Sequence, residues 1–185
     1  MPFGYNGKIL RVDLDQESYS VEQPDEIFYR TYWGGRGLGL YYMLKEMKPG
    51  VDPFSGDNLL IFSTSVIVGN GAPSMPRYTV CAKSPLTGAQ GESEAGGYWG
   101  PELKKAGFDA IVIRGIAKNP CYLWIKDGEV QFKDAAHLWG KETHQVDRLI
   151  KEELSDEKVR ICQIGIAGEN KVLYANIVNE LTHFN

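Results

Sequence analysis

The alternation of apolar and polar positions predicts strands on both sides of a helical region in the first half of the chain. A β-hairpin is expected first, with Asp15–Ser18 as its turn. Two stretches with helical spacing follow, separated by the glycines of 34–37. The predicted elements, in chain order, are strands at Lys8–Leu14 and Tyr19–Glu22, helices at Asp25–Trp33 and Leu38–Met47, and strands at Leu59–Phe62 and Arg77–Lys83.

The second half repeats this order of elements. Asp127-Gly128 is a strong turn signal between the two arms of a second hairpin. The pair Trp33-Gly34 recurs as Trp139-Gly140 at the matching place, which indicates an internal duplication. The predicted elements are strands at Tyr122–Lys126 and Val130–Lys133, a helix with Val146, Leu149, Ile150 and Leu154 on one stripe, and strands at Val159–Ile164 and Leu173–Val178.

Two tandem units of hairpin, helix, strand and strand favour an α+β fold over a doubly wound parallel sheet, because few strands are joined by a βαβ crossover. We place the pseudo-repeats at about 5–83 and 116–179 and expect residues 5–66 and 120–179 to superpose. The glycine-rich segment 84–115 would then link the two units, and a junction of this kind is a common place for a ligand.

Residues 82–103, AKSPLTGAQGESEAGGYWGPEL, hold five glycines and show no hydrophobic periodicity before Leu103. Glycines let a backbone approach a bulky polar ligand closely and expose its N–H groups. Glu92 and Glu94 would serve either as an acid/base pair or, more economically, as ligands of a divalent cation beside phosphates. A short helix is expected from 100 to 107, and the N–H groups at its start favour an anion.

Two arginines are candidates for contact with such an anion. Arg77 enters an apolar strand after a loop stiffened by two prolines, which suits bidentate binding of a phosphate; a surface salt bridge is the alternative. Arg36 lies in GGRGLGLYYMLKEM at 34–47, which lacks the G-x-G-x-x-G spacing and follows a helix instead of a strand. We expect a helix–helix break there, with core residues at Leu40, Met43, Leu44 and Met47.

Composition narrows the class of partner. The 24 acidic and 20 basic residues give a net charge of −4 without a basic block, so no nucleic acid is expected. No apolar run approaches the ~18 residues of a membrane span, and the start of the chain has no signal-peptide pattern. We therefore expect a cytoplasmic protein. Cys81, Cys121 and Cys162 are far apart in apolar segments and are expected to be buried thiols, not metal ligands.

Several long motifs occur in a fixed order between about Tyr5 and Asn179. They are YNGKILRVDL, WGGRGLGLYYMLKEM, PFSGDNLLIFS, APSMPRYTVCAKSPLTG, AGGYWGPELKKAGFDAIVIRG, DAAHLWGK and IGIAGEN. This series resembles the N-terminal domain of the aldehyde:ferredoxin oxidoreductases, the tungstopterin enzymes. The resemblance implies a β-sheet base that carries tungsten, or molybdenum in some relatives, held by the dithiolenes of two pterins. It also implies that the 4Fe-4S cysteines, the substrate channel and the proton-transfer residues lie in downstream domains absent from this chain.

The resemblance assigns candidate cofactor-binding residues. Arg77 matches the family's pterin-phosphate arginine, and Gly96 and Gly97 match its pterin-contacting glycines. Glu94-Ala95 stands where the best-known members have Asn-Ser, whose Asn helps fix Mg²⁺ between the pterin phosphates. Glu94 is therefore expected to bind Mg²⁺, with a solvent-facing side chain as the alternative. His183 takes the place of an arginine at the second phosphate site.

By this resemblance the complete protein is an enzyme that oxidises small aldehydes to carboxylic acids and passes electrons to ferredoxin, and the chain alone is inactive. Some relatives place the same platform in enzymes that reduce aromatic thioesters or carboxylic acids. A third interpretation is a non-catalytic interaction or assembly domain that uses the two-sheet face as a docking surface. The oligomeric state, including a homo-oligomer, stays open.

Overall fold

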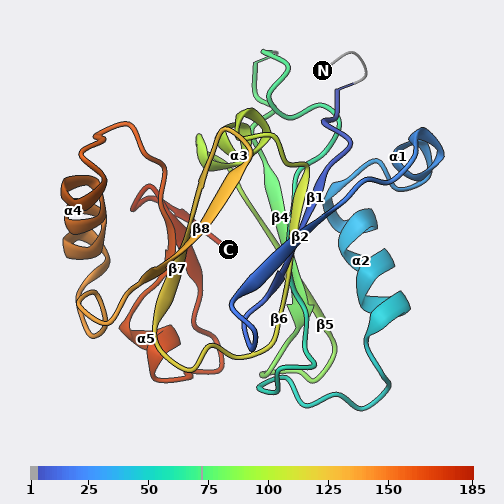
Figure 1. Ribbon diagram of the computed structural model, residues 1–185. Helices are drawn as coiled ribbons and strands as arrows, with labels where there is room; N and C mark the ends of the chain where they lie inside the picture. The colour runs from blue at the N-terminus through green and yellow to red at the C-terminus, as the bar shows by residue number, and fades with distance from the viewer. Residues whose placement is uncertain (1–3, 72) are drawn as a thin grey trace.

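The computed structural model describes residues 4–71 and 73–185, and these residues form layers of helix and sheet (Figure 1). The helix α2 (Gly35–Glu46) lies on one outer side, α4 (Thr143–Leu154) lies on the other, and the strands lie between them. Neighbouring strands are mainly antiparallel. This arrangement confirms the predicted α+β class.

The first sheet has six strands in the described residues, in the order β2-β1-β6-β3-β4-β5. The predicted hairpin forms, with Ile9 opposite Glu22 and Asp13 opposite Ser18. β1 and β6 run parallel, and the other neighbours are antiparallel. The strands are β1 (Ile9–Asp13), β2 (Ser18–Glu22), β3 (Leu60–Ser63), β4 (Tyr78–Lys83), β5 (Gln90–Ala95) and β6 (Ala110–Arg114).

The segment 84–115, which the sequence predicts to be a linker between two units, belongs to the first sheet. It supplies β5, the helix α3 (Trp99–Lys105) and β6. β6 inserts between β1 and β3, far from β5 in the strand order. The hydrophobic pattern missed β5 because it is an edge strand whose residues, apart from Ala95, are exposed or half-buried.

The second half keeps the predicted order of hairpin, helix and strands. Asp127 and Gly128 form the hairpin turn with positive φ angles of 51° and 85°. The strands, however, fall into two separate sheets, so the superposition of the two halves stays a prediction. The strands are β7 (Cys121–Lys126) and β8 (Glu129–Asp134) in one sheet, and β9 (Cys162–Ile164), β10 (Ile177–Asn179) and β11 (His183–Phe184) in the other.

The helices follow local signals in the sequence. The side chain of Asp25 accepts a hydrogen bond from Phe28 N at the start of α1 (Glu26–Tyr32), and α1 ends at Trp33 in the left-handed conformation. The pairs Trp33-Gly34 and Trp139-Gly140 both lie shortly before a long helix, and both glycines have positive φ. A short helix α5 (Ile166–Glu169) follows β9.

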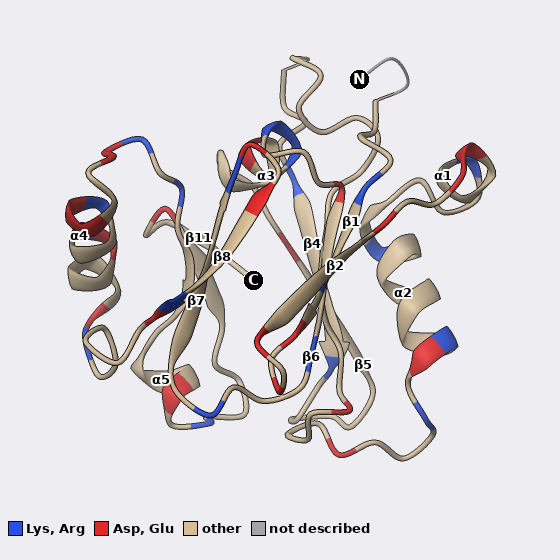
Figure 2. Ribbon diagram, viewed as in Figure 1, with Lys and Arg blue, Asp and Glu red and all other residues tan. Residues whose placement is uncertain are grey.

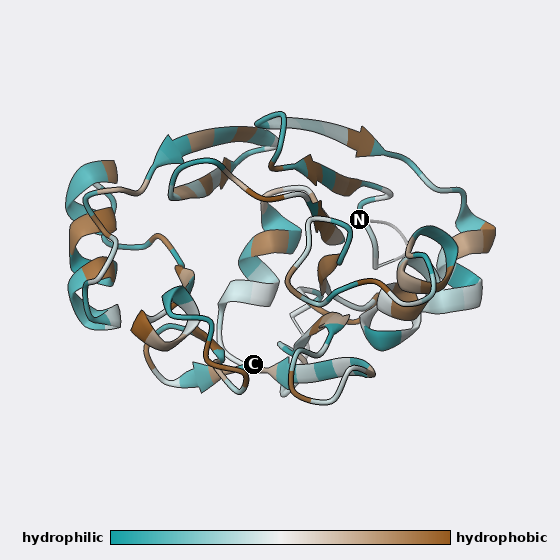
Figure 3. Ribbon diagram, turned by 90° about the horizontal axis from the view of Figure 1, so that it is seen from below, coloured by the Kyte–Doolittle hydropathy of each residue, from teal (hydrophilic) through white to brown (hydrophobic). Residues whose placement is uncertain are grey.

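Three hydrophobic clusters hold the layers together. One packs α2 on the outer face of the first sheet. A second lies between that sheet and the strands of the second half, and a third lies beneath α4. Viewed from below, many strand positions alternate between hydrophobic and hydrophilic (Figure 3). Acidic and basic residues stand together on α4 and at the end of α2 (Figure 2). Among the residues described, no helix is long and apolar enough to cross a membrane.

Two details of the predicted pattern are wrong. Leu44, expected in the core, is 83% exposed, and the buried positions of α2 include Leu38, Tyr42 and Met43. The helix starts earlier than predicted, at Gly35, and Leu44 lies away from the sheet. In the second half, β9 and β10 are shorter than predicted because their pairing extends over only three residues each.

A buried ion pair fixes α3 and β6 to the start of the chain. Lys104 Nζ lies 2.7 Å from Asp109 Oδ1, and their side chains are 1% and 3% exposed. The Asp109 carboxylate also accepts hydrogen bonds from the backbone N–H groups of Asn6, Gly7 and Lys8 and from the Tyr29 hydroxyl. In this cluster, hydrogen bonds within the protein therefore take the place of the hydrogen bonds to water that the charged groups lose on burial.

We predict that Asp109→Ala lowers the free energy of unfolding by about 3–5 kcal/mol, because it leaves the Lys104 ammonium buried without its counter-charge. Urea denaturation of the purified chain measures the change. The control is Glu102→Gln, which removes an exposed pair with Lys105 on the same helix and should change stability by less than about 1 kcal/mol. Equal effects of the two substitutions would contradict a structural role for the buried pair.

Candidate functional site

The two carboxylates of the glycine-rich segment lie on a strand, so their geometry is fixed. In the register of β4 and β5, Glu94 is opposite Thr79 and Glu92 is opposite Cys81. Residues two apart on a strand point to the same face. Cys81 belongs to the hydrophobic cluster beneath α2, which places both glutamates on the face of the sheet that α2 covers.

Arginines on either side hold these carboxylates in one cluster. Arg36 Nη2, in the first turn of α2, lies 2.9 Å from Glu92 Oε1 and 3.6 Å from Glu94 Oε1. Arg77 Nη1 lies 3.5 Å from Glu94 Oε2. The arginine side chains are 63% and 71% exposed, and the glutamates are 25% and 35% exposed. We call these four residues the Arg–Glu cluster; its formal charges cancel.

The salt bridge named as the alternative role of Arg77 is therefore present. The predicted anion contact of Arg77 stays a prediction, because a guanidinium with most of its surface in water can still donate hydrogen bonds to a second partner. The sequence indicates Arg36 only as a residue able to reach an anion. Its place in the cluster could not be read from the sequence, since 56 positions separate it from Glu92 (92 − 36).

The glycine pair continues directly from the end of β5. Ala95 is buried, and Gly97 takes a positive φ of 85°. A Cβ atom at position 97 would lie 2.6 Å from Glu180 Oε2, and at that distance an atom would have to move. Glycine adopts this backbone angle without strain, and any other residue at 97 would also displace the Glu180 side chain.

The last strand pair of the second half covers this turn. Asn179 Nδ2 donates to the Gly96 carbonyl at 3.2 Å, and Tyr98 N donates to Glu180 Oε1 at 2.7 Å. The ring of His183 lies beside Gly96, 3.6 Å from where a Cβ would stand. The predicted residues Glu94, Ala95, Gly96, Gly97 and His183 therefore gather in one region, although they come from both halves of the chain. Asn179 and Glu180, which position the turn, gave no recognisable signal in the sequence.

The cysteines show the chemistry of thiols in apolar surroundings. Cys81 is buried, and burial raises its pKa to about 11. Burial raises the pKa of Cys162 to about 12, and its Sγ lies 3.4 Å from the Tyr78 hydroxyl, which donates to Asn179 Oδ1. Partial burial also raises the pKa of Cys121. The prediction of buried thiols is confirmed for Cys81, whereas Cys121 and Cys162 are half-buried. At neutral pH these groups are protonated, and a protonated thiol is a poor metal ligand.

Within residues 4–71 and 73–185, no group of three or more His, Cys, Asp or Glu side chains is placed to hold a metal ion. Glu92 and Glu94 are two carboxylates on one face, which is an incomplete set for a hard divalent cation. Such a cation would need further oxygen ligands from water or from a bound phosphate.

Comparison with known proteins identifies the family. Residues 9–185 match the family model for the N-terminal domain of aldehyde ferredoxin oxidoreductase. The chain is 48% identical over 177 residues to the tungsten-containing aldehyde ferredoxin oxidoreductase of Pyrococcus horikoshii and 49% identical to that of Pyrococcus abyssi. Each alignment covers 96% of this chain and 29% of the relative. The chain thus spans less than a third of the length of these relatives.

A solved structure has the same fold. It is the active site complex BamBC of benzoyl coenzyme A reductase in complex with 1,5-dienoyl-CoA, with a TM-score of 0.93 and 37% sequence identity. The alignment covers 96% of this chain and 27% of that chain. An aldehyde ferredoxin oxidoreductase and a benzoyl coenzyme A reductase therefore share this domain.

We predict that Gly97→Ala destabilises the chain more than Gly88→Ala does. Both glycines have positive φ, so both substitutions carry a backbone cost, but a Cβ at 88 would meet nothing within 4 Å. The difference in the free energy of unfolding isolates the contacts with the side-chain ends of Glu180 and Asn179 and should be about 1 kcal/mol. Equal losses in thermal unfolding would show that the turn has room for a side chain.

Proposed function

Because the chain belongs to the aldehyde ferredoxin oxidoreductase family, through its N-terminal domain, we propose that it is the base that binds the tungstopterin cofactor in a larger oxidoreductase. The complete enzyme would oxidise small aldehydes to carboxylic acids in the cytoplasm and pass the electrons through a 4Fe-4S cluster to ferredoxin. The two relatives at 48% and 49% identity support the aldehyde reaction. The solved structure at 37% identity supports the alternative, a relative that reduces aromatic thioesters.

The observation that carries this proposal is the Arg–Glu cluster beside the glycine pair. Arg36 and Arg77 present exposed guanidinium groups, which bind phosphate oxygens in bidentate geometry. The turn at Gly96 and Gly97 follows directly from Glu94 and Ala95, and its backbone carries no side chain of its own at these two positions. A pterin phosphate needs positive charge and close backbone contact, and the residues present fit this group.

The two glutamates mean that a phosphate binds here only together with a cation. The formal charge of the Arg–Glu cluster is zero, and a carboxylate near a phosphate is repelled. A divalent cation reverses the sign of that interaction and accepts carboxylate and phosphate oxygens together. We therefore assign Mg²⁺ to this place, with Glu94 as its protein ligand and Glu92 as a second carboxylate held ready by Arg36.

The bound tungstopterin supplies the two-electron redox centre of the reaction. The residues of this chain bind and orient it. Arg77 donates to a phosphate, and Gly96 and Gly97 approach the pterin. Ala95 holds the end of β5 in the core, and His183 lies beside Gly96 as a donor toward the second phosphate. Because these residues only bind the cofactor, we propose that the chain alone does not oxidise aldehydes.

We predict that Arg77→Ala in the complete enzyme lowers tungsten and pterin content. A charge-assisted hydrogen bond contributes about 1.5–3 kcal/mol, so cofactor affinity should fall by roughly one to two orders of magnitude. Elemental analysis and pterin fluorescence of the purified variant measure occupancy. Arg30→Ala is the control, because Arg30 is also an exposed arginine but pairs with Glu26 on α1. Full occupancy with unchanged activity would remove Arg77 from the site.

We predict that Glu94→Gln in the complete enzyme lowers the magnesium content, because the amide is neutral and binds a hard cation more weakly than a carboxylate does. Pterin content should fall with it. Magnesium is measured by elemental analysis after gel filtration, with Glu102→Gln as the control substitution of an exposed glutamate on α3. Identical magnesium and pterin content in Glu94→Gln and wild type would show that the carboxylate has no role there.

A further inference from the structure

A series of hydrogen bonds connects the core of the molecule to the turn at Gly96 and Gly97. Cys162 Sγ on β9 lies 3.4 Å from the Tyr78 hydroxyl on β4. That hydroxyl donates to Asn179 Oδ1 at 2.8 Å, and Asn179 Nδ2 donates to the Gly96 carbonyl at 3.2 Å. Tyr78 and Asn179 are both fully buried. We call Cys162, Tyr78, Asn179 and Gly96 the hydrogen-bond relay; it joins the two halves of the molecule.

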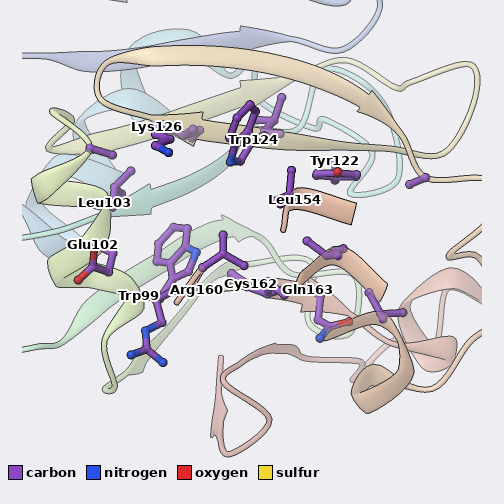
Figure 4. Close-up of a pocket in the computed structure, with 18 of the residues that line it drawn as sticks. Trp99, Glu102, Leu103, Tyr122, Trp124, Lys126, Leu154, Arg160, Cys162 and Gln163 are labelled. Carbon is purple, nitrogen blue, oxygen red and sulfur yellow. The ribbon is translucent and has the colours of Figure 1, made fainter. Parts of the chain in front are cut away.

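Packing on several sides fixes the ring of Tyr78. Its centroid lies 4.6 Å from that of Trp99 and 6.4 Å from that of Phe62. A Cβ at Gly100 would stand 3.4 Å from Tyr78 Cβ, so the first turn of α3 also lies close to this residue. Trp99 and Cys162 line the cavity of about 570 Å³ between β7 and β9 (Figure 4). Because the side chain has few torsion angles and its ring is enclosed, the position of the hydroxyl is well defined.

The chemistry of these groups gives the hydrogen-bond relay one direction. Burial raises the pKa of Tyr78, so its hydroxyl keeps the proton that it donates to Asn179. A side-chain amide has an oxygen that accepts and a nitrogen that donates. Because Oδ1 of Asn179 takes the hydrogen bond from the hydroxyl, Nδ2 is turned toward the Gly96 carbonyl. The reverse orientation of the amide would place its oxygen against the carbonyl oxygen of Gly96, and two acceptors repel each other.

The hydrogen bond to Gly96 determines how the peptide group between Gly96 and Gly97 is oriented. A trans peptide is planar, so its N–H points opposite to its C=O. With the Gly96 carbonyl bound to Asn179, the Gly97 N–H is directed away from Asn179. Neither glycine has a Cβ that would resist rotation of this peptide group. The hydrogen bond from Asn179 opposes such a rotation, as does the bond from Tyr98 N to Glu180 Oε1 at the next amide but one.

We propose that Tyr78 and Asn179 are positioning residues for the cofactor, which hold the turn at Gly96 and Gly97 in the conformation that receives the pterin. This inference rests on the proposed function, because it takes the two glycines as pterin contacts. A turn that is ordered before binding loses less conformational entropy when the cofactor binds. The Tyr78 hydroxyl therefore contributes to cofactor affinity from within the core, through Asn179 and without contact with the cofactor.

The test compares Tyr78→Phe, Asn179→Leu and the double variant of the complete enzyme. Phenylalanine keeps the ring and its contact with Trp99 but has no hydroxyl, and leucine keeps the approximate shape of asparagine without its polar atoms. The half-time of tungsten loss after gel filtration should be about fivefold shorter in each single variant. The double variant should lose tungsten no faster than Asn179→Leu, because the hydroxyl acts only through Asn179.

Hydrogen exchange of the cofactor-free complete protein gives a second measurement, which does not depend on the cofactor. In Tyr78→Phe, peptides that contain the amide of Tyr98 should show it exchanging about tenfold faster, because the turn that holds it against Glu180 is loosened. Activity per bound tungsten should stay unchanged.

Tyr122→Phe is the matched control, because it removes the hydroxyl of a tyrosine that donates to Glu153 on α4 and should change neither measurement. Circular dichroism verifies that each variant is folded. Tyr78→Phe, the smaller change, is sufficient for both measurements if Asn179→Leu does not fold.

Three results would overturn the inference, and they differ in what they mean for the proposed function. Unchanged exchange at Tyr98 in Tyr78→Phe, while Arg77→Ala still lowers cofactor occupancy, would exclude the positioning role and leave the proposed function intact. Losses that multiply in the double variant would show that Tyr78 acts independently of Asn179. Faster exchange at Tyr98 with unchanged retention of tungsten would show that the conformation of the turn does not matter to the cofactor. That last result would also remove the glycine pair from the proposed binding site.

Discussion

The buried pair of Lys104 and Asp109 is the constraint on which the architecture depends. A carboxylate and an ammonium in the interior are stable when they pair closely and further hydrogen bonds replace the water that each has lost. Asp109 obtains its partners from the backbone at 6–8 and from Tyr29 on α1, and Lys104 donates to the Gly4 carbonyl. These contacts bring the N-terminal segment, α1 and α3 to one point. Because Asp109 directly precedes β6, they also set where the central strand of the first sheet begins.

The start of β6 also determines the geometry of the candidate site. β6 is flanked by β1 and β3, and β3 in turn aligns β4 and β5, so the register of the whole sheet follows from the start of β6. The register places Glu92 and Glu94 on the same face, within reach of Arg36 on α2. The helix can approach that closely because Gly39 packs against Cys81, where a Cβ would lie 2.4 Å from the sulfur. The geometry of the Arg–Glu cluster is thus a consequence of sheet register and one close helix contact.

Sequence patterns were sufficient for elements whose signals are local. Both hairpins, α4 and the strand at Tyr78–Lys83 have periodicity or turn residues that belong to the element itself. They failed for β5, because its residues at 90–95 show no alternation of hydrophobic and polar types, and the strand owes its conformation to pairing with β4. For the candidate site, likewise, the sequence was sufficient to name residues but not to predict their contacts. Gly97 and His183 could be named from motif positions, but their meeting through Asn179 and Glu180 depends on non-local contacts.

The two halves differ in how the centre of the strand layer is filled. In the first half, a single strand with alternating apolar side chains fills the centre of the sheet and seals both faces, toward the core and toward α2. The second half has its hairpin, its covering helix and its strand pair in the same order, and an apolar cavity of about 570 Å³ lies between β7 and β9. Hydrophobic walls on both sides of open strand edges are costly to leave in contact with water. The same order of elements thus gives one six-stranded sheet in the first half and two smaller sheets around a cavity in the second half of the described residues.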